Sequence, residues 1–264
     1  VDFYKGWRDA RPIVGMIGQD WTIPEPMVSD YENLITDAKN YSDTAILFIA
    51  RSGGEGADLP TSYDGPDTFS TEGPFGALGV RFSDQKDDLD ASKSYLELSN
   101  REKTLLDKVT STFDKVILVV NSANAMELGF VKDYSQIKSV LYCPGTGQTG
   151  FDGLGEIIAG KINPSGKTAD IFLADLMNTP TSNNFGDFDY TNMNEFGVDN
   201  MFAEGGKAFP TFVNYVEGIY VGYKYYETAA AEAAAGNFEF DYDANVVYPF
   251  GYGLSYTTFT QEMG

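Results

Sequence analysis

The chain has 264 residues, of which 42% are hydrophobic and 14% aromatic, so it can bury the core of a globular domain. Its net charge of −21 disfavours nucleic acid and anionic membranes as partners, because both are polyanions. Histidine is absent, which excludes Ser-His-Asp and Cys-His catalysis and removes the commonest metal ligand. We predict no metal site and no cofactor, and no apolar stretch approaches the roughly 18 residues of a membrane span.

The first predicted elements follow a lead-in over residues 1–27, in which aromatic residues and prolines argue against regular structure. Ser29 and Glu32 have the spacing of a capping box, which predicts a helix over residues 31–38. The apolar run 45–50 predicts a strand buried on both faces. We therefore expect the domain proper over residues 28–264.

A glycine-rich loop follows this strand and holds one carboxylate, Glu55, among Gly53, Gly54 and Gly56. Glycines let the backbone turn sharply and take positive φ. In open α/β sheets, ligands bind outside the carboxyl ends of the strands. Glu55 is therefore a candidate general acid/base, and the alternative is a loop carboxylate that contacts only solvent. The polar segment 57–95 continues this loop, and its aspartates lack the spacing of a calcium-binding loop.

Helices and strands alternate in the next part of the chain. Ser99 and Glu102 form a second capping box, which predicts a helix through residues 105–113. Strands are predicted over residues 115–120, 139–142 and 169–173, with helices around residues 126–131 and 153–159 between them. This alternation indicates an α/β fold: a three-layer α/β sandwich with a mostly parallel sheet flanked by helices, a flavodoxin-like variant.

Two polar motifs follow these predicted strands. Residues 145–150 (GTGQTG) match the G-x-G-x-x-G pattern between a strand and a helix, as in dinucleotide-binding loops. Asp170 has the required distance, but it lies near the start of its strand, which disfavours nicotinamide binding. Asn121 and Asn124, after strand 115–120, have two open interpretations. They can hydrogen-bond hydroxyl groups of a ligand, or they can close an Asx turn.

Several stretches, taken in order, resemble one family. They are residues 52–58 (SGGEGAD), 116–123 (VILVVNSA), Pro144 and Gly145 with Gly150, 160–167 (GKINPSGK), 217–226 (EGIYVGYKYY) and 249–256 (PFGYGLSY). Together they resemble the second, α/β-sandwich domain of glycoside hydrolase family 3, the β-glucosidase-like enzymes. The resemblance covers about residues 28–259, nearly the whole chain.

The resemblance implies that two domains share the chemistry. A (β/α)₈ barrel, which we do not expect within this chain, is implied to supply the nucleophilic aspartate and most sugar contacts. Glu55 matches the general acid/base glutamate of the sandwich domain by its place in the glycine loop. Arg51, Asp58 and Asn121 are the predicted substrate-binding residues. The family often has Arg after the acid at Asp58, and Leu59 stands there in this chain.

The predicted function is that of the non-barrel domain of a retaining β-glycosidase of β-glucosidase type. Its expected partners are a β-linked glycoside or oligosaccharide and the barrel of the same polypeptide. We expect the domain alone to be inactive, because Glu55 would then lack the neighbouring carboxylate that raises its pKa. The alternative is a catalytically silent α/β scaffold that binds a sugar or a partner domain.

Overall fold

The computed structural model describes residues 1–10, 25–51, 88, 90, 92–184, 188–200, 204–258, 260 and 262. Its centre is a parallel sheet with the strand order β1 (Thr44–Arg51), β2 (Lys115–Ser122) and β3 (Ile137–Tyr142). The predicted parallel sheet is confirmed. Because these strands run in the same direction, their carboxyl ends lie at one edge of the sheet, where α/β proteins bind ligands.

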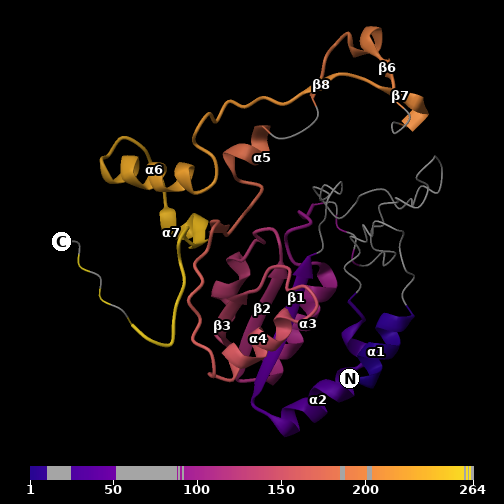
Figure 1. The fold of residues 1–264 in the computed structure, drawn as a ribbon, viewed down its shortest axis with the longest axis vertical. Coiled ribbons are helices and arrows are strands. Elements are labelled where there is room, and N and C mark those ends of the chain that lie inside the picture. The colour runs from indigo at the N-terminus through magenta and orange to yellow at the C-terminus, as the bar shows by residue number, and fades with distance from the viewer. Residues whose placement is uncertain are drawn as a thin grey trace.

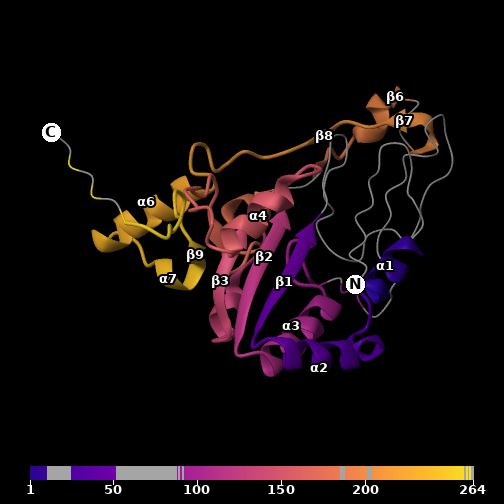
Figure 2. The same ribbon diagram turned by 60° about the horizontal axis from the view of Figure 1, so that its bottom comes forward.

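Helices lie on both faces of this sheet (Figures 1 and 2). One face carries α3 (Asn100–Thr112), with α2 (Glu32–Tyr41) beside it, and the other face carries α4 (Gly150–Ile158). The predicted α/β sandwich is thereby confirmed.

The two faces of β1 are covered unequally. Leu47 and Ile49 are buried in the core with α3, whereas Phe48 points to the other face and is 48% exposed. The ring of Phe48 contacts that of Phe151 in α4 at 6.0 Å between centroids. The prediction that this strand is buried on both faces is wrong, since the short α4 covers its face only in part.

The main core lies between α3 and the sheet. Leu106 and Val109 of α3 pack there with alternate residues of β2, namely Val116, Leu118 and Val120, each 0% exposed. The period of two along β2 and the helical spacing along α3 therefore put both apolar faces into one layer.

The two predicted capping boxes have different outcomes. At α3, the backbone N–H of Glu102 donates to Ser99 Oγ at 3.2 Å, and the Ser99 N–H donates to the Glu102 carboxylate at 2.9 Å. This box is confirmed, and it satisfies two N–H groups that a helix start leaves unpaired. At α2 the predicted Ser29 cap is wrong. A 3₁₀ turn, η1 (Val28–Asp30), comes first, and the Glu32 side chain reaches Lys108 instead.

The remaining elements form small units outside the parallel sheet (Figure 1). The antiparallel strand pairs are β4 (Phe172–Leu173) with β9 (Val246–Tyr248), β5 (Phe188–Asp189) with β8 (Thr211–Phe212), and β6 (Val198–Asp199) with β7 (Lys207–Ala208). The other helices are α1 (Asp2–Asp9), η2 (Gly129–Asp133), α5 (Pro180–Asn184), η3 (Met193–Phe196), η4 (Glu204–Gly206), α6 (Tyr223–Ala234) and α7 (Tyr242–Asn245). A second core of Ile171, Leu173, Tyr226 and Val246 joins α6 to the pair β4–β9.

Three of these elements differ from the prediction. The lead-in contains α1, although no regular structure was expected there. The strand predicted over 169–173 shrinks to β4, which pairs antiparallel with β9 outside the parallel sheet. The helix predicted around 126–131 is the 3₁₀ helix η2. None of the helices in the described ranges is long and apolar enough to cross a membrane.

Candidate active-site edge of the sheet

Two of the predicted substrate-binding residues lie at the carboxyl edge of the sheet. Arg51 is the last residue of β1 and pairs with Ser122, while Asn121 of β2 pairs with Ala50. Because neighbours along a strand point to opposite faces, Arg51 points to the α3 face and Asn121 to the α4 face. The structure thus brings both residues to one edge and separates their side chains by the sheet.

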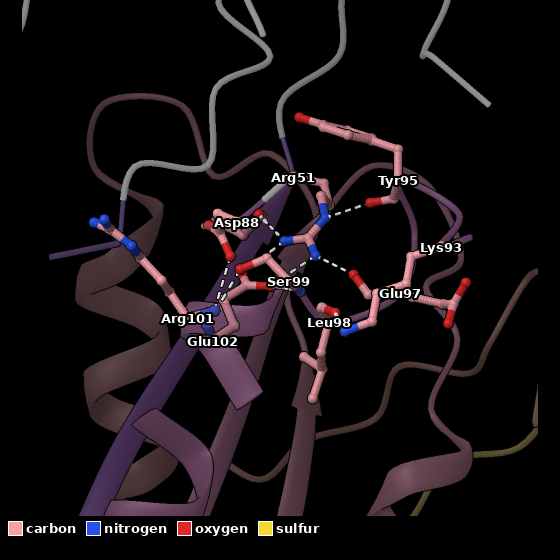
Figure 3. A network of polar contacts seen from close by, with 10 residues as sticks. Arg51, Asp88, Lys93, Tyr95, Glu97, Leu98, Ser99, Arg101 and Glu102 are labelled. Atoms are coloured by element: carbon pink, nitrogen blue, oxygen red, sulfur yellow. Dashed lines mark hydrogen bonds and ion pairs between the residues drawn. The ribbon is translucent and has the colours of Figure 1, made fainter. Parts of the chain in front are cut away.

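The Arg51 side chain is buried with 0% exposure, and each of its five N–H groups has an acceptor (Figure 3). Nε donates to the carbonyl of Tyr95 at 2.7 Å. Nη1 donates to Glu102 Oε1 and to the carbonyl of Ala50, both at 2.7 Å. Nη2 donates to Glu102 Oε2 at 2.8 Å and to the carbonyl of Glu97. The predicted substrate contact of Arg51 stays a prediction, and all of these acceptors belong to the protein itself.

Glu102 links this arginine to the start of α3. Its carboxylate receives two bonds from Arg51 and one from the Ser99 N–H, and its side chain is only 7% exposed. Charge-assisted two-point contacts of this kind are among the stronger hydrogen bonds in proteins. The residue that caps α3 therefore also holds the end of β1.

Two further acidic residues, Asp88 and Glu25, lie near the Arg51–Glu102 ion pair. Asp88 is 1% exposed and accepts the backbone N–H of Arg101 at 2.8 Å, and burial raises the pKa of its carboxyl. Burial raises the pKa of Glu25 to about 7, and the nearby charges of Glu102 and Asp88 add to this effect. The hydroxyl of Tyr31 donates to the Glu25 carboxylate at 3.1 Å and partly opposes the rise. This corner of the protein thus concentrates buried carboxyls beside two arginines.

The side chain of Asn121 forms a hydrogen bond with the backbone that follows the neighbouring strand β3. Its Nδ2 donates to the carbonyl of Cys143, just after β3, at 2.7 Å. The turn after β2 is closed by Ser122, whose Oγ donates to the Asn124 carbonyl at 2.8 Å and accepts the Asn124 N–H at 3.2 Å. The Asx-turn interpretation is therefore replaced by a serine turn, and the predicted ligand contact of Asn121 stays a prediction.

Glu127 is a residue at this edge that the sequence patterns did not single out. Burial raises the pKa of its carboxyl to about 7, with smaller contributions from the charges of Glu97 and Asp175. Its carboxylate accepts the Leu176 N–H at 2.9 Å. The signal in the sequence was an acid between two apolar residues, Met126 and Leu128, which are 0% and 2% exposed.

Glu55 and Asp58 lie outside the described residues, and so does most of the segment 57–95. Within the described parts of the chain, no group of three or more His, Cys, Asp or Glu side chains could hold a metal ion.

The last residue of the glycine pattern 145–150, Gly150, is the first residue of α4, which has no side-chain cap. Asp170 comes before β4, which is not part of the parallel sheet. A dinucleotide site needs an acid at the end of the next parallel strand, so this arrangement gives the pattern no support as a nicotinamide site.

A parallel sheet between helices, with polar side chains gathered at its carboxyl edge, defines an α/β-sandwich domain, a class in which ligands bind outside the strand ends. The family model described as "Glycosyl hydrolase family 3 C-terminal domain" matches residues 28–223, which is most of the chain. The chain therefore belongs to glycosyl hydrolase family 3, and the matched part is the C-terminal domain of that family.

Similar proteins agree with this assignment. The chain is 32% identical to β-glucosidase A of Butyrivibrio fibrisolvens over 91% of this chain and 24% of that protein. It is 28% identical to a β-glucosidase of Ruminococcus albus over 98% of this chain and 19% of that protein. The solved β-glucosidase of Paenibacillus barengoltzii superposes with a TM-score of 0.61 at 24% identity, over 97% of this chain and 21% of that one, which supports the fold. The chain thus spans about a fifth to a quarter of these proteins.

Proposed function

We propose that this chain is the non-barrel domain of a retaining β-glycosidase of β-glucosidase type, and that Glu55 is its general acid/base. The observation that carries the proposal is the family match over residues 28–223, which includes the glycine loop directly after β1. In the sequence Glu55 follows Arg51, the last residue of β1, by four positions, and α/β domains bind ligands outside the carboxyl ends of such strands. The names of the relatives supply the substrate class, a β-glucoside.

The proposed reaction needs a second carboxylate from another domain. In a retaining glycosidase two carboxyl groups lie about 5–5.5 Å apart across the glycosidic bond. An aspartate of the barrel attacks the anomeric carbon, the bond to the leaving oxygen breaks, and Glu55 gives that oxygen its proton. Water then attacks the anomeric carbon of the glycosyl-enzyme, the bond between this carbon and the aspartate breaks, and the Glu55 carboxylate takes a proton from the water.

Docking of the barrel matters for the protonation state of Glu55. A glutamic acid must keep its proton near neutral pH to act as a general acid, and a neighbouring negative charge raises the pKa of a carboxyl. In this proposal the nucleophilic aspartate supplies that charge. The isolated chain then lacks both the nucleophile and the charge that prepares the acid, so it does not turn over glucosides.

Asp58 and Asn121 are proposed to contact substrate hydroxyls beside Glu55. Asn121 lies on the α4 face of the sheet edge, and its Nδ2 is held by the carbonyl of Cys143. This leaves its amide in a fixed orientation. Removal of either side chain is expected to raise KM more than it lowers kcat, because a hydroxyl contact of this kind binds ground state and transition state alike.

The proposal is tested in the full-length parent enzyme with aryl β-glucosides of increasing leaving-group pKa. Replacing Glu55 by Ala should lower the glycosylation rate by about 10²–10⁴-fold for poor leaving groups and far less for dinitrophenol, which needs no proton. Asp58→Asn is the matched loop control and should keep the wild-type leaving-group dependence. A Glu55→Ala enzyme with the wild-type dependence would instead favour the silent scaffold.

A further inference from the structure

The residues on either side of segment 52–87 contact the same small platform, the first turn of α3 (Figure 3). Arg51, before the segment, holds Glu102 through two hydrogen bonds. Asp88, directly after it, accepts the backbone N–H of Arg101 at 2.8 Å. The two residues that flank this segment therefore contact adjacent residues, Glu102 and Arg101, of one helix turn.

We propose that Arg51 is a positioning residue for the acid/base glutamate. Together with Glu102 it fixes the place at which the chain leaves β1, four positions before Glu55. This inference rests on the proposed function, because it requires Glu55 to be the acid/base. It assigns Arg51 a role that acts through Glu55 in place of direct contact with the sugar.

Burial and hydrogen bonding favour this role. The Arg51 side chain is 0% exposed, and its five N–H groups all have acceptors inside the protein. A contact with a sugar hydroxyl would require one of these bonds to break within a buried site, which is costly. An arginine that recognises substrate needs free donors facing the ligand, and these donors face the protein.

The origin of the acceptors explains how one side chain can hold the end of β1 in place. They come from three segments: Ala50 in β1, Tyr95 and Glu97 in the turn before α3, and Glu102 in α3. The planar guanidinium presents its donors in a rigid fork, so the three segments are fixed relative to one another. Misplacement of a catalytic group by about 1 Å can lower a rate by about 10²-fold, so loosening this junction is expected to affect Glu55.

Asp88, which follows the segment, contacts the same first turn of α3. Its carboxylate is buried and also accepts a hydrogen bond from the side chain of Ser99. Ser99 is the capping residue whose backbone N–H donates to Glu102. The two residues that flank the segment, Arg51 and Asp88, therefore both contact the cap of α3. Arg51 supplies the positive charge at this cap.

The experiment compares Arg51→Lys and Arg51→Met with wild type in the full-length parent enzyme. The substrates are phenyl and 2,4-dinitrophenyl β-glucoside, and each variant is also made in the Glu55→Ala background. Lysine keeps the charge but cannot present two parallel donors to a carboxylate. Val109→Ala is the matched control, because it destabilises α3 from the core without touching the platform.

A positioning role predicts a selective loss. Arg51→Met should lower the turnover of the phenyl substrate on the order of tenfold more than that of the dinitrophenyl substrate, with Arg51→Lys in between. In the Glu55→Ala background the Arg51 substitution should add less than about twofold, because the group that it positions is already gone. Val109→Ala should leave the ratio of the two substrates unchanged.

Two outcomes would overturn the inference, and each is separable from failure of the proposed function. If both Arg51 variants keep the wild-type ratio of the two substrates while Glu55→Ala changes it, Glu55 is the acid and Arg51 does not position it. If the losses from Arg51→Met and Glu55→Ala multiply in the double variant, Arg51 acts independently of Glu55. A wild-type ratio in Glu55→Ala itself would contradict the proposed function, and with it the positioning role.

Discussion

Arg51 and Glu102 are separated by 51 positions in the chain and meet through two hydrogen bonds of 2.7 and 2.8 Å. Neither side chain is more than 7% exposed. The pair joins the last residue of the first strand to the cap of the helix that covers it. Since breaking a buried ion pair leaves an uncompensated charge, removal of one partner should cost more than removal of both.

This relationship predicts a pronounced non-additivity in stability. Arg51→Met should lower the free energy of unfolding by about 3–5 kcal/mol, because Glu102 is left buried without its partner. The double variant Arg51→Met/Glu102→Gln should be less destabilised than the sum of the two single variants. Denaturant unfolding of the four proteins measures this coupling.

The exposed pair Lys39–Asp114 provides the control for that cycle. These side chains are 34% and 75% exposed and lie 2.9 Å apart. Lys39→Met should change stability by no more than about 1 kcal/mol. Equal effects at the buried and exposed pairs would show that burial does not strengthen the Arg51–Glu102 contact.

Replacement by alanine is expected to have opposite effects on stability at two glycines, Gly129 and Gly155. A Cβ at Gly129 would lie 2.7 Å from the backbone oxygen of Ala174, which cannot move freely, so Gly129→Ala should destabilise by about 1–3 kcal/mol. Gly155 is exposed within α4, and a Cβ there meets nothing within 4 Å. Gly155→Ala should therefore stabilise by about 0.5–1 kcal/mol. Thermal unfolding of both variants tests this contrast, and a stabilised Gly129→Ala would show that the close approach is not present.

The raised pKa of Glu25 predicts that the stability of the protein depends on pH. Its pKa is raised to about 7 in the folded protein, mainly by burial, so between its unfolded value and pH 7 the folded state binds more protons than the unfolded state. Stability should therefore fall as pH rises through this window. Glu25→Gln removes the titration and keeps an acceptor for Tyr31, so its melting temperature relative to wild type should be higher at about pH 8 than at about pH 5. An equal difference at both pH values would contradict the raised pKa.

Asn121 and Asn124 form a matched pair for a test of the sheet edge. Asn121→Asp replaces the amide that donates to the Cys143 carbonyl with a carboxylate that cannot donate, which should cost about 1–3 kcal/mol of stability. Asn124 is exposed and is held through its backbone by Ser122, so Asn124→Asp should have little effect. Comparable unfolding midpoints for the two variants would contradict the assigned role of the Asn121 amide.

The parts of the fold that the sequence predicts well depend on local patterns. The strand after residue 44 and the strand after residue 114 are runs of β-branched and apolar residues, and they form the parallel pair β1–β2. The capping box at Ser99 depends on two residues three positions apart, and it forms as predicted. The same spacing at Ser29 fails, because η1 forms first and Glu32 has a long-range partner, Lys108.

The parts that the sequence does not predict depend on contacts between distant segments. The half-exposed Phe48 reflects how little of its face α4 covers, which no period along β1 reveals. The five-bond environment of Arg51 needs three segments to meet, so the sequence predicted this arginine as a substrate-binding residue at the end of the strand and did not reveal its buried partners. Glu127 was missed for the same reason, since its carboxylate accepts a hydrogen bond from the backbone N–H of Leu176, a residue distant in the sequence.

The central claim is that this domain provides the acid/base Glu55 to a retaining β-glucosidase. Its most direct test is the product that the full-length Glu55→Ala enzyme makes from 2,4-dinitrophenyl β-glucoside in the presence of azide. We expect faster turnover with azide and formation of β-glucosyl azide, because the small anion attacks the glycosyl-enzyme without needing a general base. Wild-type turnover on unactivated glucosides, with glucose as the only product in azide, would contradict the claim and place the acid/base elsewhere.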